Sequence, residues 1–211
     1  MKQSHRKLLT GAVLSSTFWL TACTVFPEAE SLKVYQLPAP GMSASANTVL
    51  PLSLRIGTPR AGSVLSSPRI VVNPRGNELQ NYKGARWSDP APALLRDHLA
   101  QAFEQSGALM AVSTDENSFS ADIHMSSDLR RFQVIYADAG PFVVIELNAR
   151  LIDPSSRNIL ASRTFIAQQP LASEAITGVV DAFKQASDAL AVQLIEWTGQ
   201  KLSSQLMSSG E

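Results

Sequence analysis

Apolar and polar residues alternate most regularly in the second half of the chain. Between positions 143 and 151 the odd-numbered residues are apolar, whereas Glu146, Asn148 and Arg150 lie between them. A period of two over this length predicts a half-buried antiparallel strand, with one face on the core and the other in water.

The same alternation continues on both sides of this strand. Residues 121–136 alternate as well, but the apolar face changes near Arg130 and Arg131, which indicates a bulge or bend. The segment 153–158 is rich in turn residues and leads into a further strand over 159–167. These three strands are therefore predicted to form an antiparallel meander.

Shorter apolar stretches precede the meander. They have the length and composition of strands, and segments rich in Pro, Gly, Ala and Ser separate them. We predict five such strands, at residues 32–37, 49–56, 69–72, 78–82 and 110–112.

Capping signals and an apolar stripe predict a first helix after Asp89. Asp89 is a suitable N-cap, and Pro90 suits the first helical position because its missing N–H would have no helical partner there. Gly107 ends the helix, as glycine commonly does in the left-handed cap conformation. The stripe consists of Leu94, Leu95, Leu99, Ala102 and Phe103.

A longer helix is predicted from about Ser173 to Leu202, followed by a flexible Ser-rich tail over 203–211. Its apolar residues recur at steps of three, four or seven and form one face. We favour the interpretation that this face covers the sheet; a seam for another subunit or helix is the alternative. The sequence thus predicts an α+β two-layer sandwich, with two helices on one face of a mostly antiparallel sheet. The apolar face consists of Ile176, Val180, Phe183, Leu190, Leu194 and Trp197.

The N-terminus has the features of a bacterial lipoprotein signal. Three basic residues precede a mostly apolar stretch that is too short to span a bilayer. The stretch closes with Leu-Thr-Ala-Cys at positions 20–23, which resembles the lipobox. We therefore expect residues 1–22 to be removed and Cys23 to carry acyl chains that anchor the mature protein. An ordinary signal peptide near a buried cysteine is the alternative.

The residues after Cys23 bear on localisation and domain organisation. Position 24 is Thr, whereas Asp there usually signals retention at the inner membrane in Gram-negative lipoproteins. By resemblance to such lipoproteins, Thr in place of this Asp implies that the mature protein is anchored at the periplasmic face of the outer membrane. Residues 23–31 are predicted to be a tether and 32–202 a single domain. Cys23 is the only cysteine, so its acylation leaves no thiol for disulfide, metal or redox chemistry.

The charge of the mature chain excludes some partners. Removing the signal leaves 15 basic residues against 18 acidic ones, a net charge of about −3. Such a domain is a poor candidate for nucleic-acid binding. The sequence also contains no polybasic run that would attract anionic lipid headgroups.

Few residues could support catalysis. The mature chain contains two histidines, His98 and His124, and neither has a carboxylate or a second histidine at metal-ligand spacing. The Gly-x-Ser-x-Gly elbow of serine hydrolases is absent. We therefore expect no enzyme activity, no metal site and no cofactor other than the covalent lipid on Cys23.

Two segments are candidates for partner binding. Tyr82, Arg86 and Trp87 lie just before the first helix, and aromatic residues and arginine are enriched at binding hot spots. Core packing is the alternative, and we favour it for Trp87. Arg130 and Arg131 at the predicted bend form the second candidate, although solvated ion pairs with neighbouring carboxylates would also explain them.

Several motifs follow one another in a characteristic order. After the lipobox come Val-Tyr-Gln-Leu-Pro at 34–38, Leu-Arg-Ile at 54–56 and Ser-Pro-Arg-Ile at 67–70. Tyr82 then precedes Ala-Arg-Trp-Ser-Asp at 85–89, the most specific part of the series. Together these motifs resemble the ABC-type transport auxiliary lipoprotein family, whose best-known type is PqiC. The resemblance extends over nearly all of the mature chain.

This resemblance implies a non-catalytic partner of an MCE-domain transport system, which moves phospholipids or other hydrophobic molecules between membranes. The lipoprotein would be held in the outer membrane by its acyl anchor and would dock an MCE-domain protein. A ring-like homo-oligomer would suit a ring-shaped partner, although no residue pattern demands one. The alternative function is a free-standing periplasmic lipid carrier. Against a carrier, aromatic residues make up only 7% of the chain, which leaves few large side chains to line a cavity.

Overall fold

The computed structural model describes residues 32–41 and 49–209. The predicted signal peptide, the tether and Cys23 therefore lie outside the described residues. The described part belongs to one compact unit that begins at Leu32. No helix in this part is both long and apolar enough to cross a membrane.

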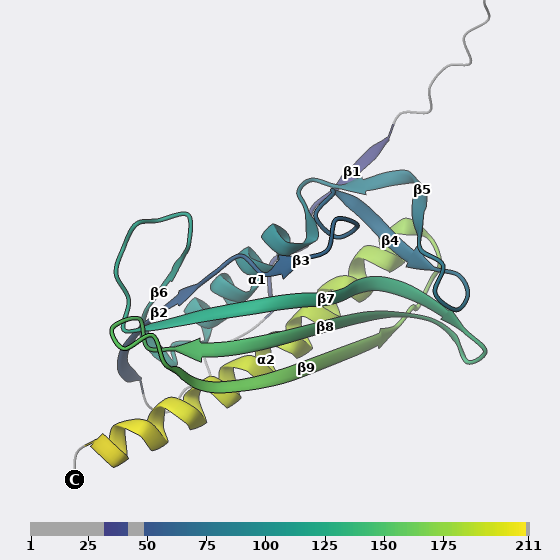
Figure 1. Cartoon of the computed structure of the whole chain (residues 1–211). Helices are drawn as coiled ribbons and strands as arrows, with labels where there is room; N and C mark the ends of the chain where they lie inside the picture. Colours follow the sequence, from purple (N-terminus) through teal and green to yellow (C-terminus); the bar gives the residue numbers. More distant parts are fainter. Residues whose placement is uncertain (1–31, 42–48, 210–211) are drawn as a thin grey trace, which may run out of the picture. The chain divides into compact units, whose positions relative to one another are not determined.

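The predicted meander is confirmed. Strands β7 (Ile123–Ala137), β8 (Gly140–Ile152) and β9 (Ile159–Pro170) pair antiparallel in that order (Figure 1). The register of β7 against β8 shifts between Leu129 and Arg131, so Arg130 is the extra residue of a bulge. The change of face seen in the sequence is the signature of that bulge.

The remaining strands extend the sheet from the other side of β7. Three of them, β2, β3 and β4, pair parallel with successive segments of β7, and β5 pairs antiparallel with β4. Strand β1 then pairs parallel with β5, and β6 with β2. The result is a nine-stranded mixed sheet that is mostly antiparallel by paired residues. The bounds are β1 (Lys33–Tyr35), β2 (Leu50–Ile56), β3 (Arg60–Ala61), β4 (Arg69–Asn73), β5 (Gln80–Trp87) and β6 (Leu109–Thr114).

Most bounds differ from the sequence prediction by one or two residues, and two differences have a clear cause in strand pairing. Strand β5 runs on to Trp87, five residues beyond the predicted end at Tyr82. Strand β3 lies within residues 58–67, a segment whose composition indicates only a loop. Pairing with β1 and β4 extends β5, and pairing with β7 defines β3, so both depend on partners distant in sequence.

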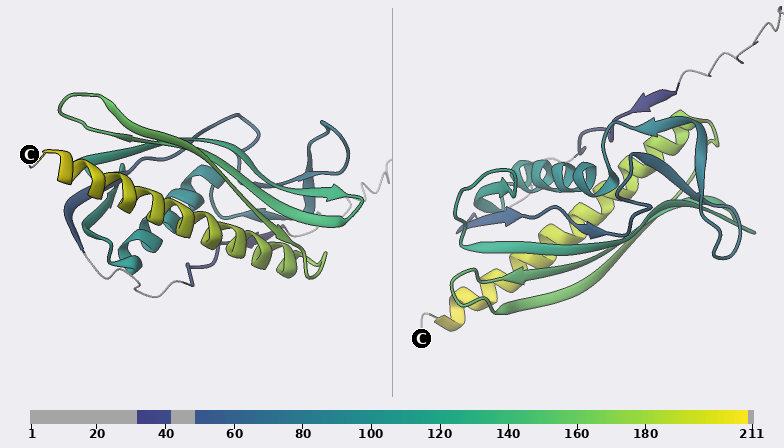
Figure 2. Two further views of the ribbon diagram at one scale, coloured as in Figure 1. Left: turned by 90° about the horizontal axis from the view of Figure 1, so that it is seen from below. Right: turned by 45° about the horizontal axis from the view of Figure 1, so that its top comes forward.

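Helices α1 (Ala91–Ser106) and α2 (Ile176–Ser209) cover one face of the sheet (Figure 2), which confirms the predicted two-layer α+β architecture. Gly107 ends α1 in the left-handed conformation, as predicted, with φ 62°. The prediction of Asp89 as N-cap is wrong by one residue, because Pro90 occupies that position and no side chain caps it. Pro92 has no N–H group, and the Ala93 N–H donates to the Pro90 carbonyl oxygen. Fewer free N–H groups therefore remain in the first turn for an acidic side chain to cap.

The apolar face of α2 packs on the sheet, as we expected. Val180, Phe183, Leu190, Leu194 and Trp197 are all buried. The helix begins three residues later than predicted and continues to Ser209, so residues 203–209 of the predicted tail are helical.

An aromatic cluster fills the space between the helices and the sheet. Trp87 lies edge-on to Phe183 at 5.2 Å between ring centroids, and Phe132 stacks on Phe183 at 4.6 Å. A second contact joins Phe165 of β9 to Trp197 of α2 at 5.3 Å. Edge-to-face and offset-stacked rings at these separations are favourable beyond the area that they bury.

His98 ties the two helices to the segment before residue 42. Its ring is buried in α1; Nε2 lies 3.0 Å from Asp188 Oδ1 of α2, and Nδ1 lies 3.2 Å from the Pro38 carbonyl oxygen. Lys184 pairs with the same carboxylate at 2.7 Å. Burial lowers the pKa of His98, and the nearby Asp188 carboxylate offsets only part of that effect.

A lowered histidine pKa predicts a stability that decreases with acidification. The folded protein binds the His98 proton less well than the unfolded chain does. The contribution of neutral His98 to the free energy of unfolding is therefore complete above the unfolded pKa of about 6.5 and decreases as the pH falls below it. We expect the Tm of the wild type to fall between pH 7 and pH 5.5, and His98→Gln to reduce that slope.

His124 provides the comparison for this experiment. Its pKa is also lowered, by burial and by the Arg55 charge, but it lies on β7 and is only partly buried. His124→Gln should therefore flatten the slope less than His98→Gln. Equal slopes in the wild type and in His98→Gln would show that His98 does not control stability in this pH range.

Candidate functional site

Trp87 is a core residue. Its side chain has 0% exposed surface and packs edge-on against both Phe132 and Phe183. Strand β5 directs Ala85 and Trp87 towards the helices, and Arg86 between them towards the opposite face. A fully buried side chain cannot contact a partner in this conformation, so Trp87 is no longer a candidate contact and its favoured core interpretation holds.

Tyr82 and Arg86 remain partly accessible. The Tyr82 hydroxyl donates a hydrogen bond of 2.6 Å to the Glu174 carbonyl oxygen, which fixes β5 to the segment before α2. Arg86 Nη1 donates to the Trp87 carbonyl oxygen at 3.2 Å. Tyr82 therefore has an internal structural role, whereas the described residues show no carboxylate paired with Arg86.

Arg130 and Arg131 lie on the face of the sheet that the helices leave uncovered. Arg131 Nη2 lies 2.6 Å from Glu146 Oε2, and Arg130 Nη1 lies 3.5 Å from the other oxygen of the same carboxylate. The Arg130 side chain is 55% exposed, because the bulge directs it outwards. Two cations thus share one anion, which leaves a local positive charge at the bend.

A second charge cluster lies beside the bulge. Asp128 of β7 pairs with Arg150 of β8 and, at 3.0 Å, with Arg60 of β3. The Arg150 guanidinium is the main reason why the pKa of Asp128 is lowered. The sequence did not identify Arg60 and Arg150 as site residues. No pattern of neighbouring residues shows that strand pairing brings both side chains to the Asp128 carboxylate. Among the described residues, no group of three His, Cys, Asp or Glu side chains could hold a metal ion.

The structure does not bring all the candidates together at one point. Arg86 lies on β5 and the Arg130–Arg131 pair on β7, with β4 between them in the sheet order. Arg69 of β4 lies directly opposite Arg86, on the same face of the sheet. Arg69 is a further candidate that sequence analysis missed.

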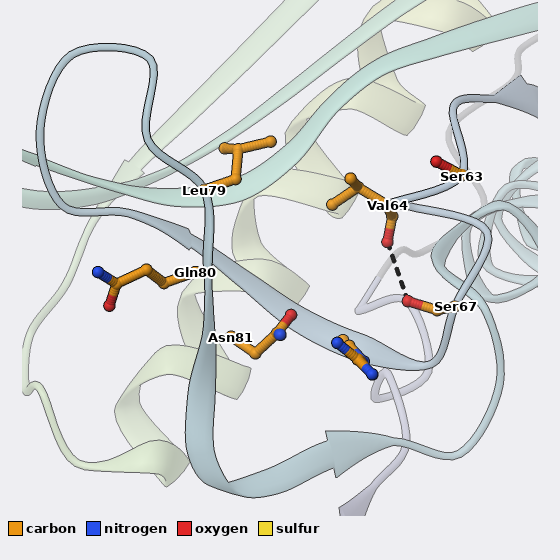
Figure 3. A pocket seen from close by; sticks show the side chains of 7 residues that line it. Ser63, Val64, Ser67, Leu79, Gln80 and Asn81 are labelled. Carbon is orange, nitrogen blue, oxygen red and sulfur yellow. Dashed lines mark hydrogen bonds between the residues drawn. The ribbon is translucent and has the colours of Figure 1, made fainter.

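Arg69 also lines an open groove of about 410 Å³. One side of the groove is the turn that precedes β4, with Ser63, Val64 and Ser67; the other is the start of β5, with Gln80 next to Leu79 (Figure 3). Val64 and Leu79 are 42% and 45% exposed. The groove therefore combines a cation and hydroxyl groups with apolar side chains.

Residues 35–195 match the family model described as the ABC-type transport auxiliary lipoprotein component. The match includes every candidate residue in the described part of the chain. It agrees with the fold found here, since it extends from β1 into α2.

Two solved structures and one curated relative are similar to this chain. The crystal structure of protein XCC0632 from Xanthomonas campestris has 33% sequence identity and a TM-score of 0.76, covering 83% of this chain and 99% of that one. The hypothetical protein CT253 from Chlamydia trachomatis, at 8% identity and a TM-score of 0.53 over 71% of this chain and 96% of that one, shares the fold alone. Protein bll6063 from Bradyrhizobium diazoefficiens is 29% identical over 78% of this chain. This chain spans only 44% of the length of that relative.

Proposed function

Since this chain belongs to the ABC-type transport auxiliary lipoprotein family, we propose that it is the non-catalytic docking component of an MCE-type transport system for phospholipids or other hydrophobic molecules. In this proposal Cys23 carries the acyl chains that hold the protein at the periplasmic face of the outer membrane. The folded domain then contacts an MCE-domain protein. An anchor confined to the membrane raises the effective concentration of the domain there, so a moderate contact is sufficient.

The distribution of packing over the two faces of the sheet supports docking. The face towards the helices is filled by large buried side chains, including Trp87, Phe132, Phe165 and Phe183. The uncovered face presents charged side chains around the β7 bulge, and exposed arginine is common in binding surfaces. A lipid carrier would instead need an apolar cavity that encloses most of its ligand.

We place the partner contact at Arg130 and Arg131. The test is a pull-down of the tagged, lipidated protein from gently solubilised membranes, with co-purifying proteins identified by mass spectrometry. We expect an MCE-domain protein in the eluate, and its loss when the folded domain is deleted but the lipid anchor is kept. Arg130→Gln combined with Arg131→Gln should weaken its capture roughly thirtyfold, the scale of removing one hot-spot interaction of about 2 kcal/mol.

Glu146→Gln is the matched control, because it breaks the same two ion pairs but keeps both cations. If the arginines contact the partner, capture should persist in Glu146→Gln and decrease only in the double arginine variant. Equal losses in both variants would mean that the ion pairs act on the fold of the domain and would contradict the assigned contact.

The lipid carrier is tested on the same material. Organic extraction of the purified protein, followed by lipid analysis, should release no stoichiometric phospholipid under the docking proposal, because the covalent anchor stays on the protein. One bound phospholipid per protein, together with an eluate free of MCE-domain proteins, would overturn docking in favour of a carrier.

A further inference from the structure

Two arginines face each other on the uncovered side of the sheet. Arg69 of β4 and Arg86 of β5 are directly opposite in the antiparallel ladder. Neither forms an ion pair with a carboxylate in the described part of the chain. Like charges in directly opposite positions destabilise a sheet. A bound anion would remove that repulsion.

The surroundings of the two arginines are amphipathic. Arg69 lines the groove of Figure 3, where the Ser67 hydroxyl already donates a hydrogen bond of 3.0 Å to the Val64 carbonyl oxygen. Val64 lies at the same groove, and Val34 of β1 is paired with Arg86 and is 51% exposed. A surface that offers two cations and apolar side chains within a few residues suits a phospholipid headgroup and the start of its acyl chains.

The position of this surface in the chain favours a membrane lipid as its ligand. Strand β1 lies at one end of the strand order and pairs with β5 at Arg86, so the described domain begins beside the arginine pair. Residues 23–31 separate Leu32 from Cys23 and, fully extended, reach about 30 Å at most. An acyl anchor on Cys23 therefore keeps this edge of the domain near the membrane surface.

We infer that the Arg69–Arg86 edge binds anionic phospholipid headgroups of the membrane that holds the anchor. The inference rests on the lipidation of Cys23 in the proposed function, but not on the identity of the partner. It fixes an orientation: the β1–β5–β4 edge lies against the membrane, and the bulge at Arg130 remains free for a partner. The absence of a polybasic run in the sequence is consistent with this, because the cations meet only through strand pairing.

The test uses the lipidated full chain in phosphatidylcholine vesicles, with or without phosphatidylglycerol. An acylated Cys23 has no free thiol, so a fluorophore can be attached at one introduced cysteine. Ser63→Cys places it at the groove, and Met110→Cys places it on β6, which ends the strand order opposite β1. Quenching by a headgroup-labelled lipid then reports which edge approaches the membrane. The intact mass of each protein reports lipidation separately.

We expect strong quenching at Ser63→Cys that requires phosphatidylglycerol, and little at Met110→Cys. Arg69→Gln with Arg86→Gln should reduce the docking constant about 25-fold, or about fivefold for each basic residue near an anionic surface. Arg69→Lys with Arg86→Lys keeps the charges and should retain most of the quenching. Quenching that is independent of phosphatidylglycerol, unchanged in the double Gln variant, or stronger at Met110→Cys would overturn the inference. The pull-down described above is read independently, so either proposal can fail alone.

Discussion

Replacing Trp87 by alanine is expected to lower the free energy of unfolding by about 3–5 kcal/mol, the usual cost of truncating a large aromatic residue in a core. Trp87 has no exposed surface and makes edge-on contacts with both Phe132 and Phe183. These contacts join β5, β7 and α2, so a cavity here weakens the connection between helix and sheet. Denaturant unfolding followed by circular dichroism measures the loss.

Trp87→Phe is the matched control, and we expect it to lose less than half as much. The Trp87 indole N–H is buried and has no hydrogen-bond partner in the structure. A buried donor without a partner carries a desolvation penalty that phenylalanine does not. This relief offsets part of the packing lost with the smaller ring. A loss in Trp87→Phe as large as in Trp87→Ala, or a negligible loss in both, would contradict this account of the cluster.

The period of apolar residues predicted those parts of the fold whose pattern is visible within a single strand or helix. The meander, the bulge at Arg130 and the apolar face of α2 each depend on residues a few positions apart. Residues 85–87 also alternate, with Arg86 between two apolar residues, and this signal could have extended β5 beyond Tyr82. Its short length and the preceding Gly84 concealed it, since glycine weakens the expectation of a strand.

The parallel pairings on β7 could not be predicted in the same way. The pair Val71 and Gln133, for example, joins residues more than sixty positions apart, and no spacing rule connects them. The charge clusters follow from those pairings. Arg60 reaches Asp128 only because β3 pairs with β7, and Arg69 meets Arg86 only in the register of β4 with β5. The composition of the chain indicated an acidic domain without polybasic runs. The fold nevertheless brings Arg69 and Arg86, which pair with no carboxylate in the described part of the chain, together at one edge.

Replacing Cys23 by serine is expected to abolish lipid attachment completely. Serine has no thiol to form the thioether, and the lipoprotein peptidase acts only on the lipidated precursor. In a Gram-negative host the variant should incorporate no labelled palmitate and should keep the 22 residues of the signal peptide, as measured by intact mass. The wild type should be found as an acylated chain that begins at Cys23. Because the described domain begins at Leu32, its thermal unfolding midpoint should not change.

Thr24→Asp separates the anchor from its destination. The variant keeps Cys23 and the lipobox, so palmitate labelling should equal that of the wild type. An Asp after the lipidated cysteine is the retention signal to which we compared this position, so the protein should move from the outer-membrane to the inner-membrane fraction of a sucrose gradient. If the wild type already fractionates with the inner membrane, the proposed location is wrong even where lipidation holds. If Cys23→Ser is still processed and labelled, the anchor lies elsewhere, and the tether length used to orient the Arg69–Arg86 edge no longer applies.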